Sequence, residues 1–280
     1  MLYFVKTDEL RAELASRKKS GLSIGLVPTM GALHEGHLSL VEAARGCDVV
    51  VVSIFVNPLQ FNSADDLKKY PRDIEKDMKL LEGKCDILYA PDPEAFYRVK
   101  PRLSIYFGEL EKILEGKYRP GHFSGVAIVV ARLLNILQPD QAFFGLKDLQ
   151  QFHLVQTLVQ DLAIPVELKG CSTVREGSGL AMSSRNELLS ATGKQTASAI
   201  YEGLQLAEKL IHDTSLNELK AQVRTFYETK EGLELEYFEL VDENFEVISA
   251  EKKPLRVSAC VAAFVEGVRL IDNLYLRSEN

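Results

Sequence analysis

The sequence lacks tryptophan, contains only four cysteines among its 280 residues, and has no excess of basic side chains. The cysteines are far apart and form no C-x-x-C pair, so neither a zinc ribbon nor a disulfide framework is indicated. Free, buried thiols in a reducing compartment are the simplest interpretation. The formal net charge of -7 argues against a broad nucleic-acid-binding surface, and we expect no nucleic-acid partner.

Long apolar runs are also missing. No segment approaches the roughly 20 residues that span a bilayer, and the N-terminal stretch has no apolar core typical of a signal peptide. We therefore expect a cytoplasmic protein without a membrane partner. The chain length and the 46% hydrophobic and 26% charged residues favour a globular protein with one larger and one smaller domain.

The standard phosphate-binding and metal-binding motifs are absent as well. The chain contains no G-x-x-x-x-G-K-[ST], no G-x-G-x-x-G after its first predicted strand, and no H-E-x-x-H. The nearest pattern is HEGH at His34–His37, where the histidines are three residues apart and no third ligand is near in sequence. We therefore expect no zinc site there.

Apolar runs alternate with amphipathic helical patterns up to about residue 170. Strands are predicted over 23–29, 48–57, 85–91, 140–145 and 164–170, and helices over 37–46, after Pro71, over 124–138 and over 147–162. The β-branched run at 48–57 is typical of a strand buried on both faces of a parallel sheet. Such βαβ units place a binding site at the carboxyl ends of the strands.

The C-terminal part has a different pattern. A polar, glycine-containing linker is predicted over 171–186, followed by helices over 191–212 and 215–229. Strands are predicted over 233–241, 245–249, 255–265 and 268–276, with a tight turn at Glu266-Gly267. The predicted fold class is α/β, with a Rossmann-like parallel-sheet domain (1–174) followed by a smaller α+β domain with antiparallel strands (175–280).

The stretch PTMGALHEGH, residues 28–37, joins a predicted strand to a predicted helix. A helix N-terminus offers unpaired N–H groups and partial positive charge, which favour a phosphate, and histidines there add hydrogen-bond donors. An ordinary strand-to-helix turn that happens to contain histidines is the alternative. The stretch alone does not separate these interpretations.

Four further clusters lie at predicted strand ends, in the linker or ahead of a helix. They are Asn57–Gln60, the cationic pair Arg119 and His122, the run 145–151 with its lysine, and the run 181–186. Hydroxyl groups and a guanidinium in the last run suit phosphate oxygens. Taken singly, the lysine fits an exposed position near a helix cap, and the last run fits a polar surface loop.

Together these stretches resemble pantothenate synthetases, the ligases that join pantoate to β-alanine. The resemblance covers VPTMGALHEGH, SIFVNPLQF, YPRD, RPGHFSGV, FGLKDLQQ and VREGSGLAMSSRN, in that order, through most of the first domain and the linker. HEGH and MSSR are similar to the HIGH and KMSKS motifs of the class I adenylyl-transferring superfamily. The resemblance implies ATP-dependent ligation through a pantoyl adenylate, with release of AMP and pyrophosphate, a requirement for Mg²⁺, and a homodimer.

The resemblance also implies residue roles. It places ATP against Met30, Gly31, His34, Gly36, His37, Gly145, Lys147, Asp148, Val174, Met182, Ser183, Ser184 and Arg185. The catalytic members of this set are His37 (as proton donor), His34, Lys147, Ser183 and Arg185. Pantoate and β-alanine are placed against Gln60, Gln151, Asn57, Arg119 and His122, and Mg²⁺ against Asp77. The chain departs from the family pattern at Leu146 and Ser178.

Two alternatives stay open at this stage. One is another class I nucleotidyltransferase acting on a small phosphorylated or carboxylate substrate. The other is a nucleotide-sensing binding module without turnover. Formation of AMP that requires both pantoate and an amine would distinguish the ligase from both.

Overall fold

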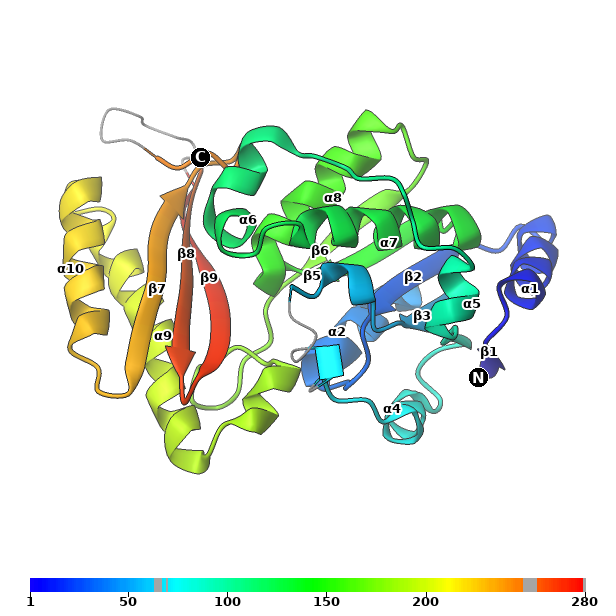
Figure 1. Ribbon diagram of the computed structural model, residues 1–280, viewed down its shortest axis with the longest axis horizontal. Coiled ribbons are helices and arrows are strands. Elements are labelled where there is room, and N and C mark those ends of the chain that lie inside the picture. Colours follow the sequence, from blue (N-terminus) through cyan, green and yellow to red (C-terminus); the bar gives the residue numbers. More distant parts are fainter. Residues whose placement is uncertain (63–66, 69, 249–255, 279–280) are drawn as a thin grey trace. The chain divides into compact units, whose positions relative to one another are not determined.

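The computed structural model describes residues 1–62, 67–68, 70–248 and 256–278 (Figure 1). The chain divides into two compact units, and each has its own hydrophobic core. Unit 1 comprises Met1–Glu111, Glu115–Leu146 and Gln151–Ser172, and unit 2 comprises Lys112–Leu114, Lys147–Gln150 and Thr173–Asn280. Of the helices that the structure describes, none combines the length and the apolar character needed to cross a membrane.

Unit 1 contains a six-stranded, wholly parallel sheet. Its strands are β1 (Leu2–Phe4), β2 (Ile24–Thr29), β3 (Val49–Ile54), β4 (Ile87–Tyr89), β5 (Gln141–Gly145) and β6 (Glu167–Cys171). The spatial order is β1-β4-β3-β2-β5-β6, so the chain builds outward from β2 to β4 and then returns to the other side of β2. The strand order therefore reverses between β2 and β5, and ligands favour the carboxyl ends of strands at such a point.

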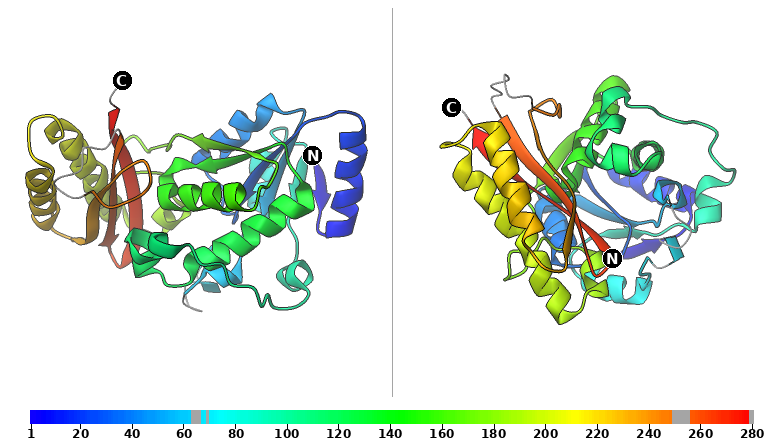
Figure 2. Two further views of the ribbon diagram at one scale, coloured as in Figure 1. Left: turned by 90° about the horizontal axis from the view of Figure 1, so that it is seen from above. Right: turned by 60° about the vertical axis from the view of Figure 1, so that its left-hand side comes forward.

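Helices cover both faces of this sheet, as Figures 1 and 2 show. One core contains side chains of α1 (Thr7–Lys19), α7 (His122–Leu137) and α8 (Leu149–Asp161), and the other contains side chains of α2 (Glu35–Ala43) and α4 (Ile74–Leu81). In β3, Val49 and Val51 belong to the first core, whereas Val50 and Val52 belong to the second. This alternation confirms the prediction of a strand buried on both faces.

The shorter helical elements of unit 1 include the following three, the last of which has its first residue in unit 2. They are the 3₁₀ turn η2 (Pro58–Gln60), the helix α5 (Pro93–Tyr97) and the helix α6 (Leu114–Tyr118). The first two elements of the chain, β1 and α1, have no counterpart in the sequence prediction. β1 is only three residues long, and α1 buries only Leu10 and Leu14, so neither element has a long apolar period in the sequence.

Unit 2 is an α+β unit built on an antiparallel sheet of order β7-β8-β9. The strands are β7 (Leu233–Val241), β8 (Arg256–Val265) and β9 (Val268–Ser278). The helices α9 (Ala191–Leu210) and α10 (Leu216–Glu228) cover one face of the sheet (Figure 2). The predicted tight turn at Glu266-Gly267 is present, and both residues have positive φ, 52° and 74°. The predicted fold class is confirmed.

The strand predicted over 245–249 is wrong for its described residues. Residues 245–248 contain only an isolated bridge between Val247 and Val241, and residue 249 lies outside the described chain. The Asp242 carboxylate accepts the backbone N–H groups of Asn244 and Glu246, and Phe245 has a φ of 63°. A turn stabilised in this way cannot continue as an extended strand.

Candidate active site

The turn after β2 is held by a buried carboxylate from α4. Asp77, only 2% exposed, accepts the N–H of Ala32 at 3.0 Å and the N–H of Leu33 at 2.8 Å. Gly31 adopts a φ of 82°, and a Cβ there would lie 3.0 Å from both Asp77 Oδ2 and Ile54 Cγ2. Glycine is therefore required by the backbone angle and by the close approach of Asp77. The turn that carries the predicted histidines has a fixed shape.

The two histidines form a capping box at the start of α2. His34 is the N-cap residue, and its Nδ1 accepts the N–H of Gly36 at 3.1 Å, while His37 Nδ1 accepts the N–H of His34 at 3.3 Å. The ring centroids are 4.1 Å apart. Because both Nδ1 atoms accept, each neutral ring is assigned the tautomer that carries its proton on Nε2. The helix N-terminus therefore carries two imidazole N–H donors, an arrangement that suits an anionic phosphate.

The surroundings of Asp77 do not fit the predicted Mg²⁺ ligand. Each carboxylate oxygen already accepts a backbone N–H, and burial raises the pKa of the Asp77 carboxyl group, although the hydrogen bonds from Leu33 and Ala32 act in the opposite direction. Mg²⁺ prefers ionised, accessible oxygen ligands in octahedral geometry. Among the described residues, no group of three His, Cys, Asp or Glu side chains could hold a metal ion. The geometry instead gives Asp77 the role of shaping the histidine turn.

Asp77→Asn is expected to raise KM for ATP by about tenfold. One of the two turn N–H groups would face an amide NH₂ and lose its hydrogen bond, which costs roughly 1–3 kcal/mol of stabilisation of the turn. The Mg²⁺ concentration for half-maximal activity is expected to stay unchanged. Steady-state kinetics at varied ATP and Mg²⁺ measure both quantities. Asp73→Asn is the control, because Asp73 is the exposed N-cap residue of α4 and asparagine caps equally well. A changed Mg²⁺ requirement in Asp77→Asn alone would restore Asp77 as a metal ligand.

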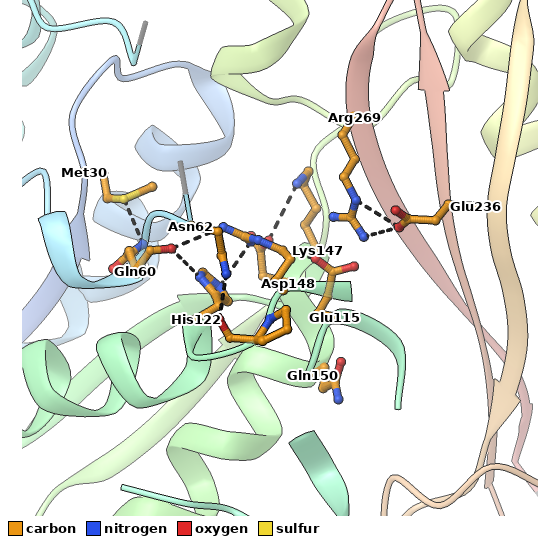
Figure 3. Close-up of polar contacts among 12 residues, drawn as sticks. Met30, Gln60, Asn62, Glu115, His122, Lys147, Asp148, Gln150, Glu236 and Arg269 are labelled. Carbon is orange, nitrogen blue, oxygen red and sulfur yellow. Dashed lines mark hydrogen bonds and ion pairs between the residues drawn. The ribbon is translucent and has the colours of Figure 1, made fainter. Parts of the chain in front are cut away.

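A second cluster in unit 1 is built around Gln60 at the end of η2. Asn57, 1% exposed, caps η2 and donates from Nδ2 to Gln60 Oε1 and to the Gly125 carbonyl, both at 3.0 Å. Gln60 Nε2 lies 2.9 Å from Met30 Sδ, in the histidine turn (Figure 3). The predicted ATP-binding residue Met30 and the predicted pantoate-binding residue Gln60 are therefore in direct contact.

His122 and Arg119 complete this cluster. His122 Nδ1 lies 2.8 Å from the Gln60 carbonyl oxygen, so this nitrogen carries the proton and donates. His122 Nε2 is then an acceptor, which agrees with Arg119 Nη1 at 3.2 Å. The structure thus brings Asn57, Gln60, Arg119 and His122 together, and their role in substrate binding stays a prediction. Gln151, half-buried in the first turn of α8, belongs to the same unit.

The predicted residue Gly145 is the last residue of β5 and belongs to unit 1, and Lys147 follows it by two positions. The remaining predicted residues, all in unit 2, are Lys147, Asp148, Val174, Met182, Ser183, Ser184 and Arg185. The Lys147 ammonium group lies 3.8 Å from the Asp148 carboxylate (Figure 3). The Lys147 side chain is 19% exposed. Asn273 of β9 donates from Nδ2 to the Lys147 carbonyl oxygen at 2.8 Å. Residues 147–150 group with unit 2, although they fall within the first domain (1–174) predicted from the sequence.

The predicted linker contains a turn closed by a bridge between Arg175 and Ala181 and by several backbone hydrogen bonds. Met182 N–H donates to the Val174 carbonyl at 2.9 Å, and Ser183 caps the 3₁₀ helix η5 (Ser184–Leu188) by accepting the N–H of Arg185 at 3.3 Å. Asn186, which is buried, donates to Glu176 Oε1 at 2.9 Å and to the Ala181 carbonyl at 3.1 Å. The MSSR motif is therefore held at both ends.

An ion pair that the sequence analysis did not identify anchors this turn. Arg175 makes a bidentate contact with the buried carboxylate of Asp272, at 2.5 and 3.1 Å, and its guanidinium lies 3.8 Å from the Tyr201 ring centroid. Asp272 in turn accepts the N–H of Asn273, the residue that contacts Lys147. No local pattern marks these residues, because Asp272 lies 97 residues from Arg175 in the chain.

A doubly wound parallel sheet with a histidine-bearing turn at its switch point is typical of nucleotide-binding α/β enzymes. A model of the family described as "Pantoate-beta-alanine ligase" matches residues 3–275. The chain belongs to this family. A pantothenate synthetase from Cytophaga hutchinsonii is 47% identical over 281 residues, 99% of each chain.

Solved structures agree with this assignment. The pantothenate synthetase from Thermus thermophilus has a TM-score of 0.92 and 39% identity, covering 99% of this chain and 100% of that one. The pantoate-β-alanine ligase from Francisella tularensis, complexed with β-γ ATP and β-alanine, has a TM-score of 0.80 and 36% identity, with coverages of 98% and 97%. The predicted family and the predicted enzyme class, an ATP-dependent, AMP-forming pantoate–β-alanine ligase, are confirmed. Another class I nucleotidyltransferase is not favoured.

Proposed function

We propose that the chain ligates pantoate and β-alanine in two half-reactions that use the residues of the two predicted sets. The observation that carries this proposal is the turn at the end of β2, where His34 and His37 cap α2. The Nδ1 atom of each ring accepts a backbone N–H, so the Nε2 atom carries the proton and is the donor. A helix N-terminus with two imidazole donors at a switch point favours the phosphates of a nucleotide. The contact between Met30 and Gln60 links this turn to the paired side chains of Asn57 and Gln60, here called the amide cluster.

In the first half-reaction the pantoate carboxylate attacks the α-phosphorus of ATP, and pyrophosphate leaves. The nucleophile is ionised at neutral pH, so the enzyme has to position it and neutralise phosphate charge rather than remove a proton. His34, His37, Lys147, Ser183 and Arg185 are proposed to supply this neutralisation, with His37 as proton donor. Gln60 and Gln151 are proposed to hold pantoate.

The rest of the proposed nucleotide site consists of residues next to these groups or beside their turns. These are Gly31, Gly36, Gly145, Asp148, Val174, Met182 and Ser184. Small residues and backbone N–H groups at such positions allow a phosphate or a base to approach the main chain.

In the second half-reaction the neutral amine of β-alanine attacks the carbonyl carbon of the pantoyl adenylate. The new C–N bond replaces the C–O bond to the phosphate, AMP leaves with that oxygen, and the amine loses one proton. Asn57, Arg119 and His122 are proposed to line the pantoate and β-alanine region. Water has to be excluded during this step because a mixed anhydride hydrolyses.

Several further properties belong to this proposal. Residues 1–174 are proposed as the nucleotide- and pantoate-binding domain, and residues 175–280 as a lid domain hinged near 176–179. Because Asp77 does not fit a metal ligand, Mg²⁺ is proposed to arrive with the phosphates of ATP. We also expect a cytoplasmic homodimer without nucleic-acid or membrane partners, and mass photometry at nanomolar concentration tests the dimer.

The test of the function is an assay of AMP formation with ATP, pantoate and β-alanine, in which each substrate is omitted in turn. AMP is expected only with all three present, whereas pyrophosphate is expected in a single burst when β-alanine alone is missing. AMP formation without pantoate would contradict the ligase function. ATP binding without any pantoate-dependent pyrophosphate release would instead support a nucleotide-sensing module.

A further inference from the structure

Tyr97 lies outside every motif discussed above, yet its hydroxyl reaches the amide cluster. It is the last residue of α5, and its hydroxyl donates to Asn57 Oδ1 at 2.8 Å. The ring packs edge-on against Phe55 and Phe96, with centroid separations of 5.8 and 5.0 Å. A tyrosine hydroxyl is protonated at neutral pH, and burial raises the pKa of Tyr97 further, so the group acts as a donor toward Asn57 Oδ1.

The contact from Tyr97 completes the hydrogen bonding of the Asn57 amide. Asn57 Oδ1 accepts from Tyr97 and from the N–H of Leu59 at 3.2 Å, while Nδ2 donates to Gln60 Oε1 and the Gly125 carbonyl. The amide therefore uses two donors and two acceptors, its full capacity. A flipped amide would place Oδ1 against the Gly125 carbonyl and Nδ2 against the Leu59 N–H, so only one orientation is compatible with these neighbours.

The fixed orientation of the Asn57 amide determines whether Gln60 offers its NH₂ group or its carbonyl oxygen to a ligand. Since Asn57 Nδ2 is a donor, it pairs with Gln60 Oε1, and the Gln60 NH₂ group points the other way, toward Met30 Sδ at 2.9 Å. A thioether is a weak acceptor and uses one of the two amide hydrogens. Gln60 thus presents an N–H donor to a ligand, which suits a carboxylate or hydroxyl oxygen and disfavours an ammonium group.

We propose that Tyr97 is a positioning residue that acts through Asn57 to hold Gln60 as a donor toward the hydroxy-acid substrate. This role rests on the proposed function, in which Gln60 binds pantoate. Tyr97 itself touches neither Gln60 nor the reacting atoms in this account, and its effect is confined to the amide cluster. Loss of its hydroxyl leaves Asn57 Oδ1 with one partner, the N–H of Leu59, so the Asn57 amide keeps the orientation that its backbone neighbours select but holds Gln60 less tightly in place.

The test is Tyr97→Phe, which removes only the hydroxyl. KM for pantoate is expected to rise about five- to tenfold, the effect of losing one buried hydrogen bond, while KM for ATP and for β-alanine stays within about twofold. Tyr89→Phe is the matched control, because the buried Tyr89 hydroxyl makes a hydrogen bond of the same length, 2.8 Å, to Thr7 in the same unit. Tyr89→Phe is expected to leave all three KM values unchanged.

A double-mutant cycle with Asn57→Ala separates relay from simple structural support. If Tyr97 acts only through Asn57, adding Tyr97→Phe to Asn57→Ala changes KM for pantoate by less than about twofold. Equal increases in all three KM values, an unchanged KM for pantoate, or additive effects in the cycle would overturn the role of Tyr97. The variants are compared with a wild-type chain that forms AMP with pantoate and β-alanine. A wild-type chain that forms no AMP under these conditions overturns the proposed function instead of the role of Tyr97.

Discussion

Lys147→Ala is expected to slow pantoate-dependent pyrophosphate release by about 10²- to 10³-fold, the usual effect of removing one group that stabilises transition-state charge. The Lys147 ammonium pairs with its sequence neighbour Asp148 at the long distance of 3.8 Å, and its backbone is held by Asn273. The backbone of Lys147 is thus held in place, while its positive charge is only weakly neutralised by Asp148. Such a charge suits phosphate oxygens. Because phosphate charge shifts as pyrophosphate leaves, kcat is expected to fall more than KM for ATP rises.

The matched control for Lys147→Ala is Lys230→Ala, which removes a lysine of the same unit that pairs with Glu202 at 3.0 Å. Single-turnover pyrophosphate release and thermal unfolding are measured for both variants. Lys230→Ala is expected to release pyrophosphate at the wild-type rate, and both variants are expected to unfold within a few degrees of the wild type. A near-normal rate in Lys147→Ala would remove Lys147 from the proposed phosphate-binding set.

The parts of the fold that the sequence predicts are those with a strong local pattern. The run 48–57 is dominated by β-branched, apolar residues, so both its strand character and its two-sided burial are visible without a structure. The turn from β2 to α2 is equally local, since His34 and His37 cap each other over three residues. A short element such as β1 escapes prediction, because the three residues that pair at this sheet edge are too few to show a period.

The contacts that support the site could not be predicted, because they join residues that are far apart in the chain. Asp77 reaches a turn 44 residues earlier in the chain, Tyr97 reaches Asn57 across 40 residues, and Asn273 reaches Lys147 across 126. Such pairs have no period or spacing in one sequence, because their geometry exists only after the sheet has formed. The motif residues themselves could be identified, whereas the residues that orient them required the structure.

Gly125→Ala is expected to disrupt the amide cluster and to lower the free energy of unfolding by about 1–3 kcal/mol, the cost of forcing extra volume into a packed site. A Cβ on Gly125 would lie 2.3 Å from the Leu59 carbonyl oxygen and 2.8 Å from the Gln60 backbone nitrogen. Both are backbone atoms, which cannot rotate away as a side chain could. Alanine favours a helix interior over glycine by about 1 kcal/mol, yet contacts this short outweigh that gain. KM for pantoate is therefore expected to rise by at least about tenfold, since η2 has to move and Asn57 loses its contact with the Gly125 carbonyl.

Gly46→Ala is the control for this substitution, because a Cβ on Gly46 meets no atom within 4 Å and the residue belongs to the same unit. Its free energy of unfolding, measured by urea denaturation, is expected to stay within about 0.5 kcal/mol of the wild-type value. The change in the free energy of unfolding and the change in KM for pantoate have to be compared for Gly125→Ala. If Gly125→Ala loses stability but keeps its KM for pantoate, then η2 relaxes without moving Gln60, and the close approach of α7 supports the fold only. If KM rises while stability is retained, the same glycine instead sets the position of the substrate-binding amide.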